Sequence, residues 1–101
     1  MCGFVGGTEP EWSYGAALDA IAHRGPDASK LHVANPITVG FRRLSIIDLS
    51  AEANQPMFAA DGTWLVFNGE VYGYQALRKT LELLGHRFRT ASDTEVVLNA
   101  Y

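Results

Sequence analysis

Cys2, directly behind the initiator methionine, is the residue whose type and position best suit covalent chemistry. A small second residue normally permits removal of the methionine, which would leave Cys2 with both a thiol and a free α-amine. A peptide α-amine titrates at roughly 7.7–8, so it is a base near neutral pH only a few bonds from the sulfur. It could take the thiol proton, directly or through one water, and return a proton to a leaving amine. Cys2 is therefore a candidate N-terminal nucleophile that needs no histidine partner.

Taken alone, Cys2 has a plainer explanation, because a lone cysteine is more often a small buried apolar side chain than a nucleophile. As the single cysteine of the chain it cannot form an internal disulfide, so a cytoplasmic setting is expected. The three histidines, His23, His32 and His86, have no metal-ligand spacing with one another or with Cys2, and no metal is predicted. No phosphate-binding loop or dinucleotide fingerprint is present.

The composition is that of one small, ordered domain. The 101 residues are 48% apolar and 19% charged, which is enough apolar surface to offset the entropy of ordering the chain. The net charge is −3 and no basic run exceeds Arg42-Arg43, which argues against a nucleic acid or an anionic membrane as partner. No apolar stretch approaches the length of a membrane span, and no secretory signal is present.

The elements that must position Cys2 follow from the hydrophobic pattern. Strands are predicted at residues 2–7 (buried), 30–34, 37–47, 63–67 and 87–90. Helices are predicted to start at residues 9–11 and run through 12–22, to cover 74–84, and to run from Ser92 to the last residue. Because the strands cluster between helices, the pattern favours an α+β fold.

Several residues mark the boundaries and the core of these elements. Turns are expected at Asn35-Pro36 and Asp61-Gly62, with a polar loop at 48–55. Gly85 is predicted to end the second helix, whose packing face would be Leu77, Leu81 and Leu84. Ser92 and Glu95 are predicted to form a capping box at the start of the last helix. Trp12 and Trp64 are expected in the core.

Six short segments carry a more specific signal. They are Met1-Cys2-Gly3-Phe4-Val5-Gly6, His23-Arg24-Gly25-Pro26-Asp27, Arg43-Leu44-Ser45-Ile46-Ile47-Asp48-Leu49-Ser50, Asn54-Gln55-Pro56-Met57, Phe67-Asn68-Gly69-Glu70-Val71-Tyr72 and Ser92-Asp93-Thr94-Glu95. In this order they resemble the class II glutamine amidotransferases. Within that group they are similar to the glutaminase domain of the glutamine-hydrolysing asparagine synthetases and their polysaccharide-cluster relatives. The resemblance covers residues 1–101.

The resemblance implies an N-terminal-nucleophile hydrolase fold, a four-layer αββα sandwich with two antiparallel sheets between helical layers. Residues 1–101 would be the N-terminal portion of such a glutaminase domain, truncated before its later strands. The predicted last helix, which reaches Tyr101 without a stop signal, leads to the same expectation. An ATP-using synthetase domain would lie in cis, outside this chain.

The resemblance also assigns catalytic roles. Cys2 would attack the side-chain amide of L-glutamine, form a γ-glutamyl thioester and release ammonia. The Asn68 side chain and the Gly69 backbone N–H would form the oxyanion hole, and such a donor is typically worth about 3–4 kcal/mol. The alternative is that Asn68-Gly69 is only a turn, the commonest use of that dipeptide. Gly73 departs from the family pattern, in which asparagine commonly follows the tyrosine, and it would free the backbone at the helix entrance.

Glutamine is a zwitterion, so its pocket needs both charges. The resemblance gives the α-carboxylate to Arg43, whose guanidinium suits a carboxylate, and the α-ammonium to Asp93 and Glu70. The alternatives are a surface strand charge for Arg43 and a helix-dipole contact for Asp93. The resemblance places Leu44 and Ile47 in the lining of the site, and the alternative for both is ordinary packing in a strand. Arg24 belongs to a segment that is structural first, and it is the member of that segment expected to reach the pocket. Arg42 is expected at the surface.

Two hypotheses remain open at this point. In the first, the domain hydrolyses glutamine and passes ammonia to the synthetase domain, which would use ATP and Mg²⁺ on aspartate or another carboxylate. Glutamine hydrolysis itself would need no cofactor. In the second, the chain is a non-catalytic truncated remnant or a glutamine-sensing module. The resemblance is compatible with a homodimer of the full-length protein.

Overall fold

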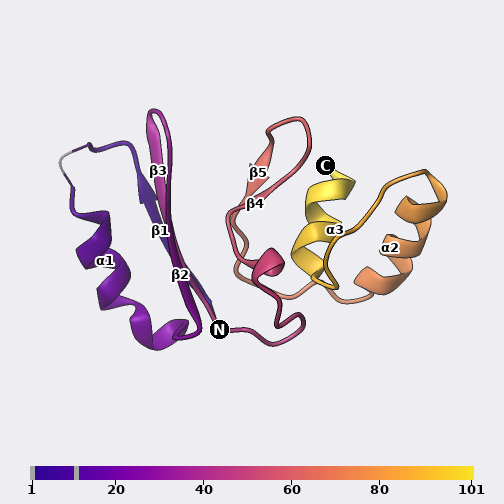
Figure 1. Ribbon diagram of the computed structural model, residues 1–101, viewed down its shortest axis with the longest axis horizontal. Helices are drawn as coiled ribbons and strands as arrows, with labels where there is room; N and C mark the ends of the chain where they lie inside the picture. The colour runs from indigo at the N-terminus through magenta and orange to yellow at the C-terminus, as the bar shows by residue number, and fades with distance from the viewer. Residues whose placement is uncertain (1, 11) are drawn as a thin grey trace. The chain divides into compact units, whose positions relative to one another are not determined.

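The structure, a computed structural model, describes residues 2–10 and 12–101. It divides the chain into two compact units, Met1–Ser45 and Ile46–Tyr101. Figure 1 traces the chain through both, with colours that run from indigo near the N-terminus to yellow at the C-terminus. Each unit combines antiparallel strands with helix, so the predicted α+β class is confirmed.

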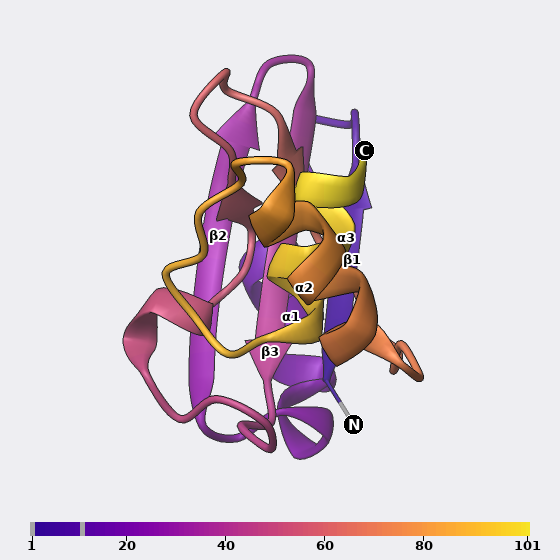
Figure 2. The same ribbon diagram turned by 90° about the vertical axis from the view of Figure 1, so that its right-hand side faces the viewer.

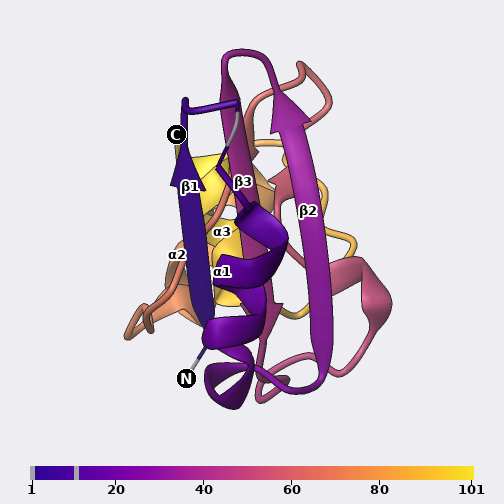
Figure 3. The ribbon, with the colours of Figure 1, turned by 90° about the vertical axis from the view of Figure 1, so that its left-hand side faces the viewer.

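The first unit is a three-stranded antiparallel sheet with one helix on it. Its strands are β1 (Gly3–Gly7), β2 (Ala28–Ala34) and β3 (Ile37–Arg43), in the order β1-β3-β2. β2 and β3 form a hairpin around the predicted turn at 35–36. Helix α1 (Tyr14–Ala20) lies across one face of this sheet, as Figure 3 shows. The central strand β3 therefore organises the unit.

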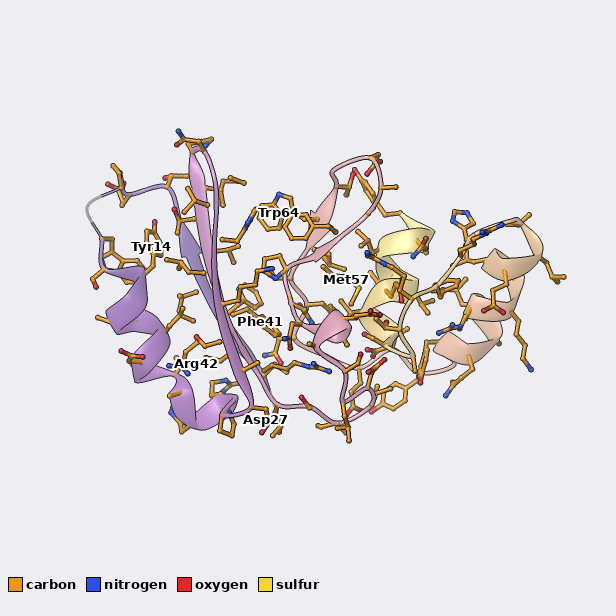
Figure 4. The ribbon with its side chains drawn as sticks, in the orientation of Figure 1. Tyr14, Asp27, Phe41, Arg42, Met57 and Trp64 are labelled. Atoms are coloured by element: carbon orange, nitrogen blue, oxygen red, sulfur yellow. The ribbon has the colours of Figure 1, made fainter. Side chains whose placement is uncertain are left out.

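The side chains of β3 alternate between the two faces of the sheet. Gly40 faces α1, where a Cβ atom would come within 2.6 Å of Leu18, so glycine is what lets the helix pack closely. Arg42 shares that face, and its guanidinium donates to the Leu18 carbonyl at 3.0 Å and pairs with Asp19 at 2.8 Å. Phe41 points away from α1 (Figure 4) and is 1% exposed. Arg42 is thus not a free surface charge, because it ties α1 to the sheet.

Several boundaries in the first unit differ from the prediction. The helix begins after Ser13, whose hydroxyl accepts from the Ala16 N–H. Before it, the Trp12 N–H donates to the Glu9 carbonyl in a turn, so the predicted start at 9–11 was too early. Glu11 lies outside the described residues. β3 ends at Arg43, four residues short of the prediction. β1 is an edge strand with Phe4 49% exposed, so the strand was predicted correctly but its burial was not. Trp12 is also outside the core, 53% exposed and edge-on to Tyr14.

The second unit places α3 (Asp93–Ala100) between a short hairpin and a second helix, as the two views in Figures 1 and 2 show. The hairpin is β4 (Met57–Phe58) with β5 (Trp64–Leu65), and the second helix is α2 (Tyr74–Leu83). A 3₁₀ turn at Ala51–Ala53 interrupts the predicted polar loop. The core includes Ala53, Met57, Leu81, Val96 and Leu98, all 7% exposed or less.

Turn and capping signals in this unit are largely confirmed. Gly62 has φ +91°, and Asp61 accepts from the Thr63 N–H at 2.8 Å. This backbone hydrogen bond lowers the pKa of the Asp61 carboxyl below its ordinary value. Gly85 has φ +97° directly after α2, and Gly73 has φ +74° directly before it. These are left-handed conformations that favour glycine.

Two predicted strands of the second unit were wrong in extent or type. The strand at 63–67 shrinks to Trp64–Leu65, because the Phe67 backbone pairs with the side chain of Gln55. Residues 87–90 form no strand, because the backbone N–H groups of Arg89 and Thr90 donate to the Glu95 carboxylate. Side chains, rather than neighbouring strands, satisfy the backbone in both places.

Two further predictions for this unit hold only in part. Ser92 caps α3 through the Thr94 N–H at 3.0 Å, but Glu95 does not reach back to complete the capping box. The Ser92 N–H donates to the Thr90 hydroxyl instead. On α2, Leu81 is buried as predicted, whereas Leu77 and Leu84 are 39% and 72% exposed.

Candidate functional site

Cys2 lies at the point where β3 gives way to irregular chain. Its Sγ accepts from the Leu44 N–H at 3.3 Å and donates to the Leu44 carbonyl at 3.5 Å, and the residue is half-buried. The backbone of Leu44 can do this because β3 has ended one residue earlier. The structure therefore brings together two of the predicted site residues and assigns Leu44 a backbone contact with the sulfur.

The His-Arg-Gly-Pro-Asp segment packs against the same place. The Arg24 guanidinium donates to the Cys2 carbonyl at 3.1 Å. Gly25 approaches β3 so closely that a Cβ atom would stand 2.4 Å from the Arg42 carbonyl carbon. Asp27 accepts from the Ser45 N–H at 2.7 Å and donates its own N–H to Arg43. This segment fixes the carbonyl of Cys2 and the main chain at the end of β3.

Arg43 is the last residue of β3 and is 7% exposed. By strand alternation it shares a face with Val39 and Phe41, opposite the face that carries α1. A charged side chain is rarely buried to this degree unless it has partners. Its burial contradicts the surface-charge alternative.

Asn68 and Gly69 follow β5 and precede α2, so they do not join two strands of a hairpin. A type I′ hairpin turn would also require positive φ at both central residues. In the described part of the chain the glycines with positive φ are Gly62, Gly73 and Gly85, and no other residue type has it. This dipeptide is therefore not a hairpin turn, although the chain bends at Gly69. Asn68 is half-buried, whereas Gly69 and Glu70 are exposed.

Gly69 also has a steric reason to be glycine. A Cβ atom there would come within 3.0 Å of the Phe67 ring, tighter than ordinary van der Waals contact. The main chain at residue 69 thus lies close to the aromatic ring two residues earlier, in a segment without regular structure.

Asp93 is the first residue of α3 and is 6% exposed. Its carboxylate accepts from the Val71 N–H at 3.0 Å, directly after Glu70. The helix start and the segment that holds Asn68, Gly69 and Glu70 therefore lie side by side in the second unit. Asp93 has a helix-dipole position and a specific partner at the same time.

Ile47 is 45% exposed in a loop, so the strand-packing alternative fails for it. Its neighbour Asp48 holds this loop to the start of α3. One Asp48 oxygen accepts from the Ser50 N–H and the other from the Ala91 N–H, both at 2.7 Å.

Sequence reasoning gave no role to Gln55, although it lies in one of the six segments. Its side-chain amide accepts from the Phe67 N–H at 2.5 Å and donates to the Phe67 carbonyl at 3.0 Å. Gln55 is 6% exposed. The available signal was that the Gln55 amide stands immediately before a proline and Met57, which is buried. An amide at a buried position needs hydrogen-bond partners.

The predicted site residues therefore form two groups, one in each unit. Cys2, Arg24, Arg43 and Leu44 belong to the first unit, and Ile47, Asn68, Gly69, Glu70 and Asp93 belong to the second. Within residues 2–10 and 12–101, no three His, Cys, Asp or Glu side chains are grouped so that they could hold a metal ion. The chemistry available to these groups is a thiol, a buried guanidinium, neutral amide donors and carboxylates.

Comparison with known proteins identifies the class to which these residues belong. The family model described as a glutamine amidotransferase domain matches residues 1–101. The chain belongs to this family of glutamine amidotransferase domains.

Its curated relatives include glutamine-hydrolysing asparagine synthetases. It is 42% identical over 111 residues to asparagine synthetase 1 of Bacillus subtilis (strain 168), covering 100% of this chain and 17% of that protein. It is 43% identical over 84 residues to asparagine synthetase 2 of the same organism, covering 82% of this chain and 11% of the relative. For asparagine synthetase 1 of Arabidopsis thaliana the identity is 43% over 82 residues, with 80% of this chain and 14% of the relative covered.

The chain thus spans less than a fifth of the length of these relatives. None of the helices within the described ranges has the length and apolar character needed to cross a membrane.

Proposed function

We propose that this domain hydrolyses L-glutamine to glutamate and ammonia, with Cys2 as N-terminal nucleophile. The observation that carries the proposal is the family match over residues 1–101 with a cysteine in second position. The half-buried Sγ of Cys2 against the Leu44 backbone, with Arg24 on its carbonyl, supports it. The fold proposed for the whole domain is the αββα sandwich of N-terminal-nucleophile hydrolases, of which these two antiparallel sheets would be part.

The proposed reaction has two stages. The free α-amine of Cys2 takes the proton from Sγ, and the thiolate attacks the side-chain amide carbon of glutamine. The carbon–nitrogen bond then breaks, the ammonium of Cys2 returns the proton to the leaving nitrogen, and ammonia departs. Water attacks the γ-glutamyl thioester in the second stage, which gives glutamate and restores the thiol. In each stage negative charge develops on the carbonyl oxygen, and the Asn68 amide and Gly69 N–H stabilise it.

Charge complementarity supports the proposed pocket for the amino-acid end of glutamine. Arg43 binds the α-carboxylate, since its guanidinium is buried at the end of β3. Asp93 and Glu70 bind the α-ammonium, and the contact of Asp93 with the Val71 N–H keeps these two acids on neighbouring segments. Leu44 and Ile47 line the site.

The relatives are named asparagine synthetases, so the proposed fate of the ammonia is transfer to a synthetase domain outside these 101 residues. That domain would use ATP with Mg²⁺ to activate a carboxylate, with aspartate as the first acceptor to test. Glutamine hydrolysis by Cys2 involves no cofactor. The proposed location is the cytoplasm, where a free thiol stays reduced.

The test is the Cys2→Ala variant in the gene product that contains this chain. Intact mass spectrometry first establishes that Met1 is absent. A diazoketone analogue of glutamine should then add one equivalent to the native protein and none to Cys2→Ala. We expect glutamate formation to fall by a factor of at least about 10³, because the covalent route is lost. Retained Met1, or hydrolysis unaffected by the substitution, would support a glutamine-sensing module instead.

A further inference from the structure

We propose that Gln55 is a positioning residue for the oxyanion donors Asn68 and Gly69. The inference rests on the proposed function for its catalytic consequence, and on the hydrogen bonds of Gln55 for its mechanism. Gln55 does not touch the reacting atoms in this proposal. It acts through the backbone of Phe67, the residue directly before Asn68.

The contact resembles a strand pairing made by a side chain. Gln55 Oε1 accepts from the Phe67 N–H and Nε2 donates to the Phe67 carbonyl, so both polar groups of one peptide residue are held by one amide. β5 ends at Leu65, so Phe67 lies beyond the two-stranded ladder. Gln55 supplies at Phe67 the donor and acceptor that a neighbouring strand would otherwise supply.

A second contact connects Gln55 to the start of α3. Its Nε2 also lies 3.3 Å from the Thr94 hydroxyl oxygen, and Thr94 is 4% exposed. Asp93, the residue before Thr94, accepts from the Val71 N–H. The segment from Phe67 to Val71 is therefore held at both ends, by Gln55 at its beginning and by Asp93 at its end.

Burial makes these hydrogen bonds costly to lose. Gln55, Asp93 and Thr94 are each 6% exposed or less, and a buried polar group that loses its partner has no water to replace it. Between the two fixed ends lie Asn68, Gly69 and Glu70, which have no regular secondary structure of their own. An oxyanion donor is effective only if it is already in place when charge develops. The anchoring of Phe67 by Gln55 provides that preorganisation.

The first test begins with the unsubstituted gene product. Amide hydrogen exchange measured by NMR should show the Phe67 N–H protected, although it lies outside the β-ladder. In Gln55→Met, which keeps the side-chain length and removes both hydrogen bonds, the Phe67 amide should exchange at least about tenfold faster, while the β1–β3 ladder is unchanged. A Phe67 amide that exchanges freely in the native chain would overturn the inference, even if the variant does not fold.

The second test measures catalysis in the gene product. Active sites are titrated with the diazoketone analogue, and kcat is expressed per titrated site, so unfolded molecules do not count. For Gln55→Met we expect kcat per site to fall by at least about tenfold with KM changed less than about threefold, because the oxyanion donors are displaced while the charged residues remain. The matched control is Gln75→Met on the exposed surface of α2, which should leave both constants unchanged.

A smaller fall in kcat per site, or a loss carried by KM, overturns the positioning role, since a merely structural residue would change only the number of titratable sites. Failure of the proposed function is recognised separately. The native protein would then neither hydrolyse glutamine nor take up the analogue at Cys2, whatever the exchange of Phe67 shows.

Discussion

The carboxylate of Glu95 illustrates how single side chains hold this chain together. It is 3% exposed and accepts from the Arg89 N–H, the Thr90 N–H and the Thr90 hydroxyl at 2.6–2.9 Å. Asp48 does the same for Ser50 and Ala91 with its two oxygens. Carboxylates therefore replace strand pairing along the segment that leads into α3. The position of Asp93, a proposed ligand of the substrate ammonium, depends on this segment.

Replacing Glu95 by alanine should destabilise the chain strongly. The substitution leaves two backbone N–H groups and a buried hydroxyl without their acceptor, and we expect the free energy of unfolding to fall by about 2–4 kcal/mol. Urea unfolding measures the change. The control is Glu82→Ala, which removes a half-exposed carboxylate paired with Arg78 one helical turn away and should cost no more than about 0.5 kcal/mol. Equal losses in the two variants would contradict the anchoring role of Glu95.

At the scale of elements, the end of β3 is the feature that positions Cys2. β3 stops at Arg43, and the next residue offers its N–H and carbonyl to the Cys2 sulfur. The segment after α1 crosses this end, with Pro26 bridging to Arg43 and Gly25 against the Arg42 backbone. A longer β3, as the hydrophobic pattern predicted, would have engaged the Leu44 backbone in a ladder. The early end of the strand is therefore part of how Cys2 is held.

Gly25→Ala tests this crossing. Because the new methyl group would meet backbone atoms of Arg42 and Arg43 at 2.4–2.6 Å, the chain must shift, and we expect the free energy of unfolding to fall by about 1–3 kcal/mol. Gly15→Ala, in α1 with nothing within 4 Å of the added atom, should instead raise it by about 0.5–1 kcal/mol. Denaturant titrations of both variants give the comparison, and a neutral Gly25→Ala would show that the crossing tolerates a side chain.

At the scale of the whole molecule, the residues with proposed roles are distributed over both units. Cys2 and the buried Arg43 belong to Met1–Ser45, and Asn68, Gly69 and Asp93 belong to Ile46–Tyr101. The proposed proton transfer also places a requirement on the N-terminus. The amine of Cys2 must be free, so the chain has to begin at residue 2 after processing.

Adding glycine and serine in front of Cys2 should therefore abolish glutamine hydrolysis without unfolding the domain. The thiol is unchanged, but its nitrogen becomes a peptide nitrogen that cannot act as a base. We expect turnover below about 1% of the native rate, which matches the loss of a general base, with an unaltered thermal unfolding curve. The same two residues at the carboxyl end of the gene product serve as control. Full turnover by the extended protein would show that the amine takes no part.

The sequence by itself determined the family, the α+β class and the local signals. Turn and capping residues such as Gly62, Gly85 and Ser92 act through their own backbone geometry and immediate neighbours, so they could be identified without the fold. Arg43, Asp93 and the Asn68-Gly69 pair were singled out from motif resemblance, and their chemical roles remain proposals.

Only the tertiary structure decided what depends on residues distant in sequence. The early ends of β3 and β5, the absence of a strand at 87–90 and the exposure of Trp12 could not be found from periodicity. The partners of Gln55, Glu95 and Arg24 could not be found from it either. A hydrophobic pattern records which side chains avoid water, whereas a buried amide or carboxylate can satisfy any backbone group that the fold brings within hydrogen-bond distance. That choice is made by packing, and it placed Gln55 on Phe67, beside the proposed oxyanion donors.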